Sequence, residues 1–189
     1  MKLILIRHGA TAANEEKRYC GVTDIGLSPA GKAKLQHRRN QTNYPDITGF
    51  RIITSGMKRS EQTLQILYGE VPHAANTAFR EIDFGAFEMH TYEELKNDPR
   101  YLAWIAGDNE KKFPPGGESG EEMKKRVIGA LDSLIAQGQD TLLLTHGGVI
   151  AAIMAHVFPN EKKTRYEWQP EPGGGYQIDL IAKKYEAFA

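Results

Sequence analysis

The strongest constraint on the fold is a run of four aliphatic residues, 3–6, that ends directly in Arg7-His8-Gly9. An uninterrupted apolar run of this kind predicts a strand that is buried on both faces. A second run, 141–145, ends in the same way, in His146-Gly147-Gly148. In open α/β sheets, ligands bind at the carboxyl ends of the strands. If the two strands are neighbours, the two histidines can meet there, and the adjacent arginine indicates a site for an anion.

The rest of the chain alternates between strand-like and helix-like segments. Further strands are expected at 51–54 and at 176–182, the latter at a sheet edge. Helices are expected at about 29–39, 58–67, 120–137 and 149–157, with shorter helical pieces between 91 and 106 and loops at 81–88, 114–117 and 170–175. Ser28 and Ser119 are typical N-caps, and Glu122 would complete a capping box with Ser119. The alternation predicts an α/β sandwich on a mainly parallel sheet.

Length and composition exclude several classes of protein. A chain of 189 residues most simply forms one domain, 1–189. The formal net charge is zero, so no overall basic field attracts nucleic acid or an anionic membrane. The single cysteine, Cys20, excludes an internal disulfide and a cysteine-based metal cluster. We expect no signal peptide and no membrane-spanning segment, and therefore a cytoplasmic protein.

The side chains at these strand ends suit phosphoryl transfer. The imidazole of His8 is a candidate nucleophile, because histidine can form a covalent intermediate. Arg7 is adjacent to it, and Arg59 begins the helix after the strand 51–54, where free N–H groups also favour an anion. His146 could donate a hydrogen bond to the same phosphoryl group. A leaving alkoxide needs a proton, and Glu81 is the best-placed acid by sequence context.

Five ordered motifs resemble those of the histidine phosphatase superfamily, also called the phosphoglycerate mutase-like family. They are LIRHGATAAN with the following YCGVTDIGLSPAGKAKL, ITSGMKRSEQT, REIDFGAFE, GGES and LLLTHGGVI. The resemblance extends to about Ala155 and implies a three-layer α/β/α sandwich. It implies that His8 is phosphorylated and then hydrolysed, and that Glu81 protonates the leaving group and activates water. The implied phosphate-binding residues are Arg7, Asn14, Thr23, Arg59, His146 and Gly147. No metal or other cofactor is implied, and the expected partner is a small phosphate ester.

The resemblance is greatest to α-ribazole phosphatases, through the segments RYCGVTDIGLSPAG and REIDFG. Broad-specificity phosphatases of the same family have very similar segments, so both substrate classes stay open. The phosphoryl-binding residues carry no information about the rest of the substrate. We expect other residues to contact that part of the substrate, namely Phe87, Met89, His90, Tyr166 and Trp168.

Three other functions compete with a phosphatase. A phosphoglycerate mutase must shield its phosphohistidine from water, and the stretch between Glu81 and the 114–117 turn is short for that task. A metal hydrolase would place a cation beside two arginines, and no zinc-type ligand spacing appears. A binding module without activity would be expected to have lost a catalytic residue. Asp83 and Glu88 remain alternatives to Glu81 as the acid, and His37, His73, His90 and His156 are expected at the surface.

Overall fold

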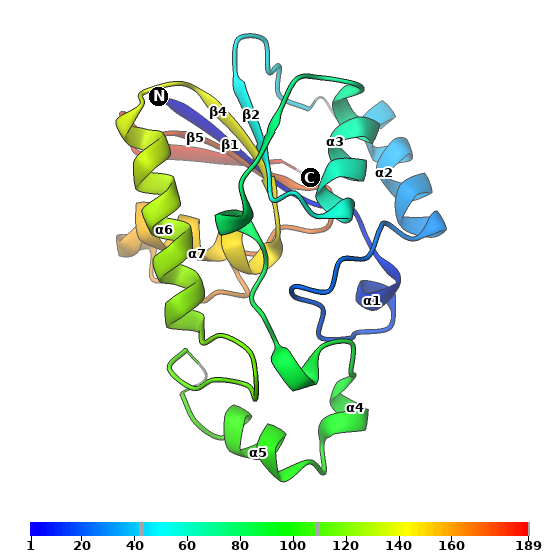
Figure 1. The fold of residues 1–189 in the computed structure, drawn as a ribbon. Coiled ribbons are helices and arrows are strands. Elements are labelled where there is room, and N and C mark those ends of the chain that lie inside the picture. Colours follow the sequence, from blue (N-terminus) through cyan, green and yellow to red (C-terminus); the bar gives the residue numbers. More distant parts are fainter. Residues whose placement is uncertain (42–43, 109, 189) are drawn as a thin grey trace.

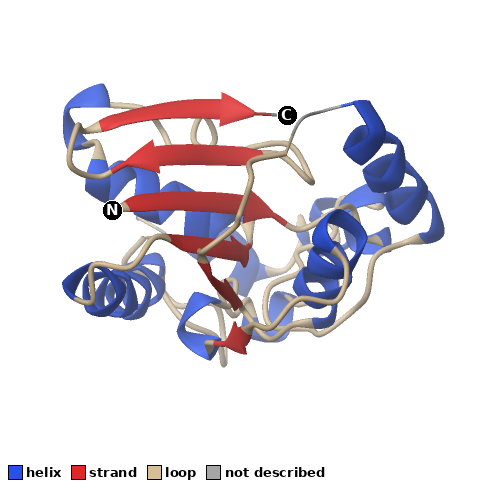
Figure 2. Ribbon diagram, turned by 90° about the horizontal axis from the view of Figure 1, so that it is seen from above, coloured by secondary structure: helices blue, strands red, loops and turns tan. Residues whose placement is uncertain are grey.

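A computed structural model describes residues 1–41, 44–108 and 110–188. Its centre is a six-stranded sheet in the order β3-β2-β4-β1-β5-β6. The strands are β1 (Lys2–Arg7), β2 (Arg51–Thr54), β3 (Ala74–Ala75), β4 (Thr141–Thr145), β5 (Gly175–Asp179) and β6 (Lys184–Phe188). The first four strands of this order run parallel, whereas β5 and β6 pair antiparallel with their neighbours (Figure 2). The predicted mainly parallel sheet is therefore confirmed.

Helices cover the sheet on both sides, which makes the fold a three-layer α/β/α sandwich (Figure 1). The helices are α1 (Ala12–Glu15), α2 (Pro29–Gln41), α3 (Lys58–Tyr68), α4 (Tyr92–Leu95), α5 (Pro99–Ile105), α6 (Gly120–Ala136) and α7 (Gly147–Val157). Short 3₁₀ turns lie at Thr77–Phe79, Gly85–Phe87 and Pro159–Glu161. Ser28 and Ser119 accept N-terminal amides of α2 and α6, as predicted, although only the Ser119 half of the expected capping box forms.

The aliphatic run of β1 supplies both halves of the core. Leu3 and Leu5 pack with α6 and α7 on one face of the sheet, and Ile4 and Ile6 pack with α2 and α3 on the other. All four side chains are fully buried. This is the expected result for alternating side chains in a central strand that is covered on both faces.

The C-terminal end of the sheet differs from the prediction. The strand expected at 176–182 ends at Asp179 and is not at the edge, because β6 pairs along its outer side. The Asp179 carboxylate accepts the amides of Ile181 and Ala182, which turns the chain back into β6. The alternation of apolar and polar residues in the sequence continues past this turn, so it did not mark the end of β5. The pairing of β6 with β5 is known only from the fold.

The sheet has a topological switch between β1 and β4. These two strands are parallel neighbours, but the chain after β1 leads to α2 on one face and the chain after β4 leads directly to α7 on the other. Such a divergence opens a crevice at the carboxyl ends of the strands, where doubly wound sheets bind ligands. Among the described residues, no helix is long and apolar enough to cross a membrane.

Candidate active site

The two histidines of the sequence motifs meet at this crevice. Arg7 pairs with Thr145 in the β1–β4 ladder, so His8 and His146 are the next residues on neighbouring strands. The backbone amide of His8 donates to the Thr145 carbonyl at 3.0 Å. The two imidazole rings lie edge to face with their centroids 5.1 Å apart. Both side chains are buried, His146 completely.

The tautomer of His8 follows from its hydrogen bond. Its Nδ1 lies 2.7 Å from the Gly9 carbonyl oxygen, which can only accept, so Nδ1 carries the proton. Burial, followed by the positive charges of Arg59 and Arg7, holds the pKa of His8 well below its usual value, and the Gly9 hydrogen bond opposes this only in part. His8 is therefore neutral near pH 7, with the Nε2 lone pair available as a nucleophile.

His146 is fixed by a chain of directed hydrogen bonds. The Arg59 Nε–H donates to His146 Nδ1 at 3.2 Å, which leaves the ring proton on Nε2, 2.8 Å from Ser55 Oγ. The Ser55 hydroxyl then donates to Ser60, whose hydroxyl donates to the Met57 carbonyl. Burial and the neighbouring His8 and Arg59 also lower the pKa of His146. Both ring nitrogens of His146 are therefore engaged within the protein, so in this arrangement His146 does not offer the hydrogen bond to a phosphoryl group that the sequence predicted. The donor beside it is the Arg59 guanidinium.

Arg59 brings a buried positive charge to the site, and Arg7 brings a partly buried one. Arg59 is 1% exposed, and its guanidinium donates to the carbonyls of Gly21 (2.6 Å) and Thr23 (2.9 Å). Arg7 donates to the Pro170 carbonyl, whereas its Nε is buried without a partner among the described residues. Neither arginine forms an ion pair within that part of the chain. Buried cations without a carboxylate partner favour the binding of an anion.

Glu81 is held at the N-terminus of α7. Its Oε2 accepts the Gly148 amide at 2.9 Å, and its Oε1 accepts the Ile82 amide at 3.1 Å. A Cβ at position 148 would clash with the Glu81 carboxylate, so only glycine allows this close approach. Burial lowers the pKa of Arg7 and of Arg59, and the negative charge of Glu81 opposes this shift in both.

The other two candidate acids have structural roles. The Glu88 carboxylate accepts the amides of Gly21, Val22, Thr23 and Phe84 and the hydroxyl of Thr23. Asp83 accepts the Gly85 amide at 2.7 Å. These bonds shape the 21–23 loop and the 83–88 turn.

The remaining predicted phosphate-binding residues lie nearby but are partly engaged within the protein. The Asn14 side-chain oxygen accepts from Thr11 and caps α1, which uses only the oxygen of that amide. The Thr23 hydroxyl donates to Glu88. A Cβ at Gly147 would lie 3.3 Å from Arg7 Cζ, so this glycine lets Arg7 approach α7. At the start of α3, the Lys58 amide is already taken by Asp24.

Two residues of the site were missed at the level of sequence. Ser55 orients His146 and lies in the same motif as Arg59, directly after β2, so its position beside a strand end was a usable signal. Gln169 reaches the site from the C-terminal loop, where its carboxamide lies against Gly147 and beside Arg7. No sequence signal marked Gln169, because this loop comes to β1 only in the folded chain, through the bonds between Arg7 and the segment 170–174.

Two of the expected substrate-reading residues are excluded by burial. Phe87 is 0% exposed and packs with Leu95, Tyr101 and Trp104 under α4 and α5. Trp168 is 1% exposed and stacks among Tyr176, Tyr185 and Phe158. The prediction that these two residues contact the substrate was therefore wrong. An aromatic residue next to a loop can equally well be buried in the core. Of the other candidates, Met89 is half-buried, and His90 and Tyr166 are exposed. His37, His73, His90 and His156 are at the surface, as predicted.

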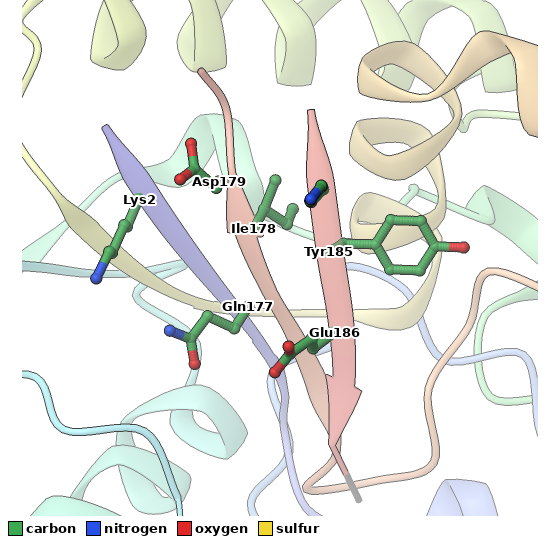
Figure 3. Close-up of a pocket in the computed structure, with 7 residues that line it drawn as sticks. Lys2, Gln177, Ile178, Asp179, Tyr185 and Glu186 are labelled. Carbon is green, nitrogen blue, oxygen red and sulfur yellow. The ribbon is translucent and has the colours of Figure 1, made fainter. Parts of the chain in front are cut away.

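Several cavities lie elsewhere in the described structure. A groove of about 220 Å³ between α6 and α7 is lined by small or apolar residues, among them Gly148, Ala151 and Ala152, and by the charged residues Glu110, Lys124 and Arg165. Figure 3 shows a second cavity of about 210 Å³ on β1, β5 and β6. It includes Lys2, which begins β1, so it lies at the opposite end of this strand from His8. Among the described residues, no group of three or more His, Cys, Asp or Glu is placed to hold a metal ion.

Comparisons with known proteins agree with this geometry. A model of the histidine phosphatase superfamily (branch 1) matches residues 3–186. The rat 6-phosphofructo-2-kinase/fructose-2,6-bisphosphatase 4 is 32% identical over 155 residues, which are 82% of this chain and 32% of that protein, so the chain spans about a third of that relative. A structure of phosphoglycerate mutase from Thermus thermophilus has a TM-score of 0.76 at 30% identity, covering 100% of this chain and 99% of that one. An Escherichia coli structure, provisionally named an alpha-ribazole-5'-P phosphatase, has a TM-score of 0.85 at 24% identity, covering 100% and 95%.

The buried neutral histidines predict a stability that depends on pH. Each histidine titrates near pH 6.5 in the unfolded chain but well below that in the folded protein. Between these values the unfolded chain binds more protons, so the free energy of unfolding falls on acidification by up to about 1.4 kcal/mol per pH unit for each histidine. Urea unfolding from about pH 7 to about pH 5.5 in phosphate-free buffer measures this slope. His8→Asn should make it shallower, and the exposed control His37→Asn should not. Equal slopes in the wild type and His8→Asn would contradict the buried neutral imidazole.

Proposed function

The chain belongs to the histidine phosphatase superfamily, and we propose that it is a phosphomonoesterase that works through a phosphohistidine on His8. The observation that most supports this is the orientation of His8, whose Nδ1 proton is fixed on Gly9 while its Nε2 is free. Beside it lie the buried Arg59 and the partly buried Arg7, neither with a carboxylate partner in the described part of the chain, and the Arg7 Nε–H is buried and unpaired there. A neutral nucleophile next to buried positive charge suits a phosphate dianion.

In the first step, the Nε2 lone pair of His8 attacks phosphorus and the bond from phosphorus to the ester oxygen breaks. Arg7 and Arg59 bind the non-bridging oxygens, on which the negative charge is spread. Glu81, in its protonated form, transfers its proton to the leaving oxygen, which departs as an alcohol. The product on the enzyme is phosphohistidine, and Glu81 is left as a carboxylate on the Gly148 amide.

In the second step, Glu81 takes a proton from a water molecule whose oxygen attacks the phosphohistidine. The bond between Nε2 and phosphorus breaks, its electron pair returns to His8, and inorganic phosphate leaves. Glu81 is again protonated and both residues are restored. His146 stays fixed throughout by its hydrogen bonds to Ser55 and Arg59, and the Arg59 guanidinium holds the phosphoryl group in line.

For the substrate we propose α-ribazole-5'-phosphate, hydrolysed in the cytoplasm during cobalamin biosynthesis. This rests on the resemblance of the 18–31 and 80–85 segments to α-ribazole phosphatases. The groove between α6 and α7 supports it, because its lining includes Gly148, whose amide binds Glu81, and a flat apolar base can pack on the neighbouring Ala151 and Ala152. A broad-specificity phosphatase is the alternative. A mutase is the second alternative, which the name of the Thermus thermophilus neighbour favours.

The nucleophile is tested by His8→Ala. Turnover of nitrophenyl phosphate should fall by at least about a thousandfold, because the covalent route is lost. A rapid quench with labelled substrate should show acid-labile phosphate on the wild type and none on the variant. His156→Ala, at an exposed histidine, is the matched control and should keep full activity. Near-normal turnover by His8→Ala would overturn the mechanism.

The acid is tested by Glu81→Gln. Turnover of an alkyl phosphate should fall by about 10²–10⁴, because its alkoxide needs the proton, and turnover of nitrophenyl phosphate should fall far less. Asp83→Asn keeps an oxygen for the Gly85 amide and should change neither rate appreciably. Equal losses on both substrates in Glu81→Gln would instead assign this residue to positioning.

Reaction class and substrate are tested by a panel of phosphate esters, assayed with EDTA present. Incubation with 3-phosphoglycerate and 2,3-bisphosphoglycerate should release inorganic phosphate, since the described residues between Glu81 and the 114–117 turn form only the short turn Gly85–Phe87, α4 and α5, which is little to shield the intermediate. Rapid formation of 2-phosphoglycerate without free phosphate would favour a mutase. Activity lost in EDTA and restored by zinc or manganese would favour a metal hydrolase. If α-ribazole phosphate is hydrolysed no faster than nitrophenyl phosphate, the specific substrate is wrong.

A further inference from the structure

The backbone that carries Glu81 is held by a single arginine of α6. Arg126 Nη1 donates to the carbonyls of Ala78 (2.9 Å) and Arg80 (2.7 Å), and its Nη2 donates to the carbonyl of Glu81 itself (3.0 Å). Ala78 lies in the short 3₁₀ turn Thr77–Phe79, and residues 80–84 belong to no helix or strand, so no regular ladder satisfies the carbonyls of Arg80 and Glu81. The Arg126 side chain therefore takes the place of secondary structure along this segment.

Glu118 holds the same segment from its other side. Its carboxylate binds the Arg126 guanidinium through both oxygens, with the Nε bond at 3.0 Å, and also accepts the Asp83 amide at 3.2 Å. The Glu118 amide donates in turn to the Asp83 carbonyl at 3.0 Å. Both side chains are largely shielded, at 27% and 19% exposure, which strengthens a bidentate pair relative to a surface one.

We propose that Arg126 and Glu118 are positioning residues that place the Glu81 carboxyl for proton transfer, an inference that rests on the proposed phosphatase chemistry. A general acid acts only within hydrogen-bond reach of the leaving oxygen, and a shift of about 1 Å can cost about a hundredfold in rate. The Gly148 amide fixes only the tip of Glu81. Arg126 and Glu118 fix its main chain, so Glu81 is held both at its backbone and at its carboxylate.

The geometry also predicts that lysine cannot replace Arg126. A planar guanidinium reaches three carbonyls and a bidentate carboxylate at once, whereas an ammonium is a point charge with three donors. Arg126→Lys therefore keeps the charge that acts on His146 while it loosens the acid segment. Glu118→Gln removes the opposite charge and one of the bidentate bonds.

The experiment measures Arg126→Lys and Glu118→Gln on alkyl and nitrophenyl phosphates, each alone and in the Glu81→Gln background. We expect each single variant to lose at least about tenfold in kcat on the alkyl ester and less than about threefold on the nitrophenyl ester. In the Glu81→Gln background neither should cause further loss on the alkyl ester. Arg51→Lys is the matched control, since Arg51 also binds a main-chain carbonyl, that of Leu134, but at the far end of β2.

Two further readouts separate this inference from the proposed function. Amide hydrogen exchange at Ile82 and Asp83 should be faster in Arg126→Lys than in the wild type, with melting temperatures recorded for both. The yield of phosphohistidine from nitrophenyl phosphate should stay at the wild-type level. Equal losses on both esters, losses that multiply with Glu81→Gln, or unchanged exchange would overturn the positioning role. A wild type that forms no phosphohistidine would instead overturn the proposed function.

Discussion

The whole site depends on the parallel pairing of β1 with β4. Because Arg7 is in register with Thr145, the residues that follow, His8 and His146, leave the sheet side by side. A slip of one residue would turn the alternating aliphatic side chains of β1 to the wrong faces. The same register therefore fixes the two cores and the catalytic pair. The stability of the sandwich and the geometry of the site are two consequences of one set of hydrogen bonds.

Positive charge is the second organising element. Arg59 is buried at the start of α3, where it orients His146 and donates to the carbonyls of Gly21 and Thr23. Hydrogen bonds to neutral carbonyl oxygens, and not a carboxylate, offset the free-energy cost of burying the Arg59 guanidinium. Its positive charge is therefore not neutralised and can act on a ligand. The carboxylates Glu88 and Glu118 bind loops and Arg126 instead, and Glu81, the proposed acid, binds the Gly148 amide at the start of α7.

Sequence patterns predicted helices and strands most reliably where residues close together in the chain decide the structure. β2 and β4 have the predicted bounds, and α2, α3 and α7 differ from prediction by one or two residues. The prediction was wrong where long-range packing decided the outcome. Phe87 and Trp168 are aromatic residues of a kind often found in binding sites, but here they are buried in aromatic clusters. The strand that contains Tyr176 is not an edge strand, because β6 pairs along its outer side.

The two buried strands, the residues that follow them and the family resemblance could be predicted from the sequence, because apolar runs and ordered motifs are local in the chain. The fold was needed to show which nitrogen of His8 carries the proton, which amides bind the Glu81 carboxylate and which side chains hold its main chain. Those answers depend on contacts across long separations, such as Glu81 with Gly148 and Arg59 with His146. Spacing in a sequence carries no information about such contacts until the sheet brings the strand ends together.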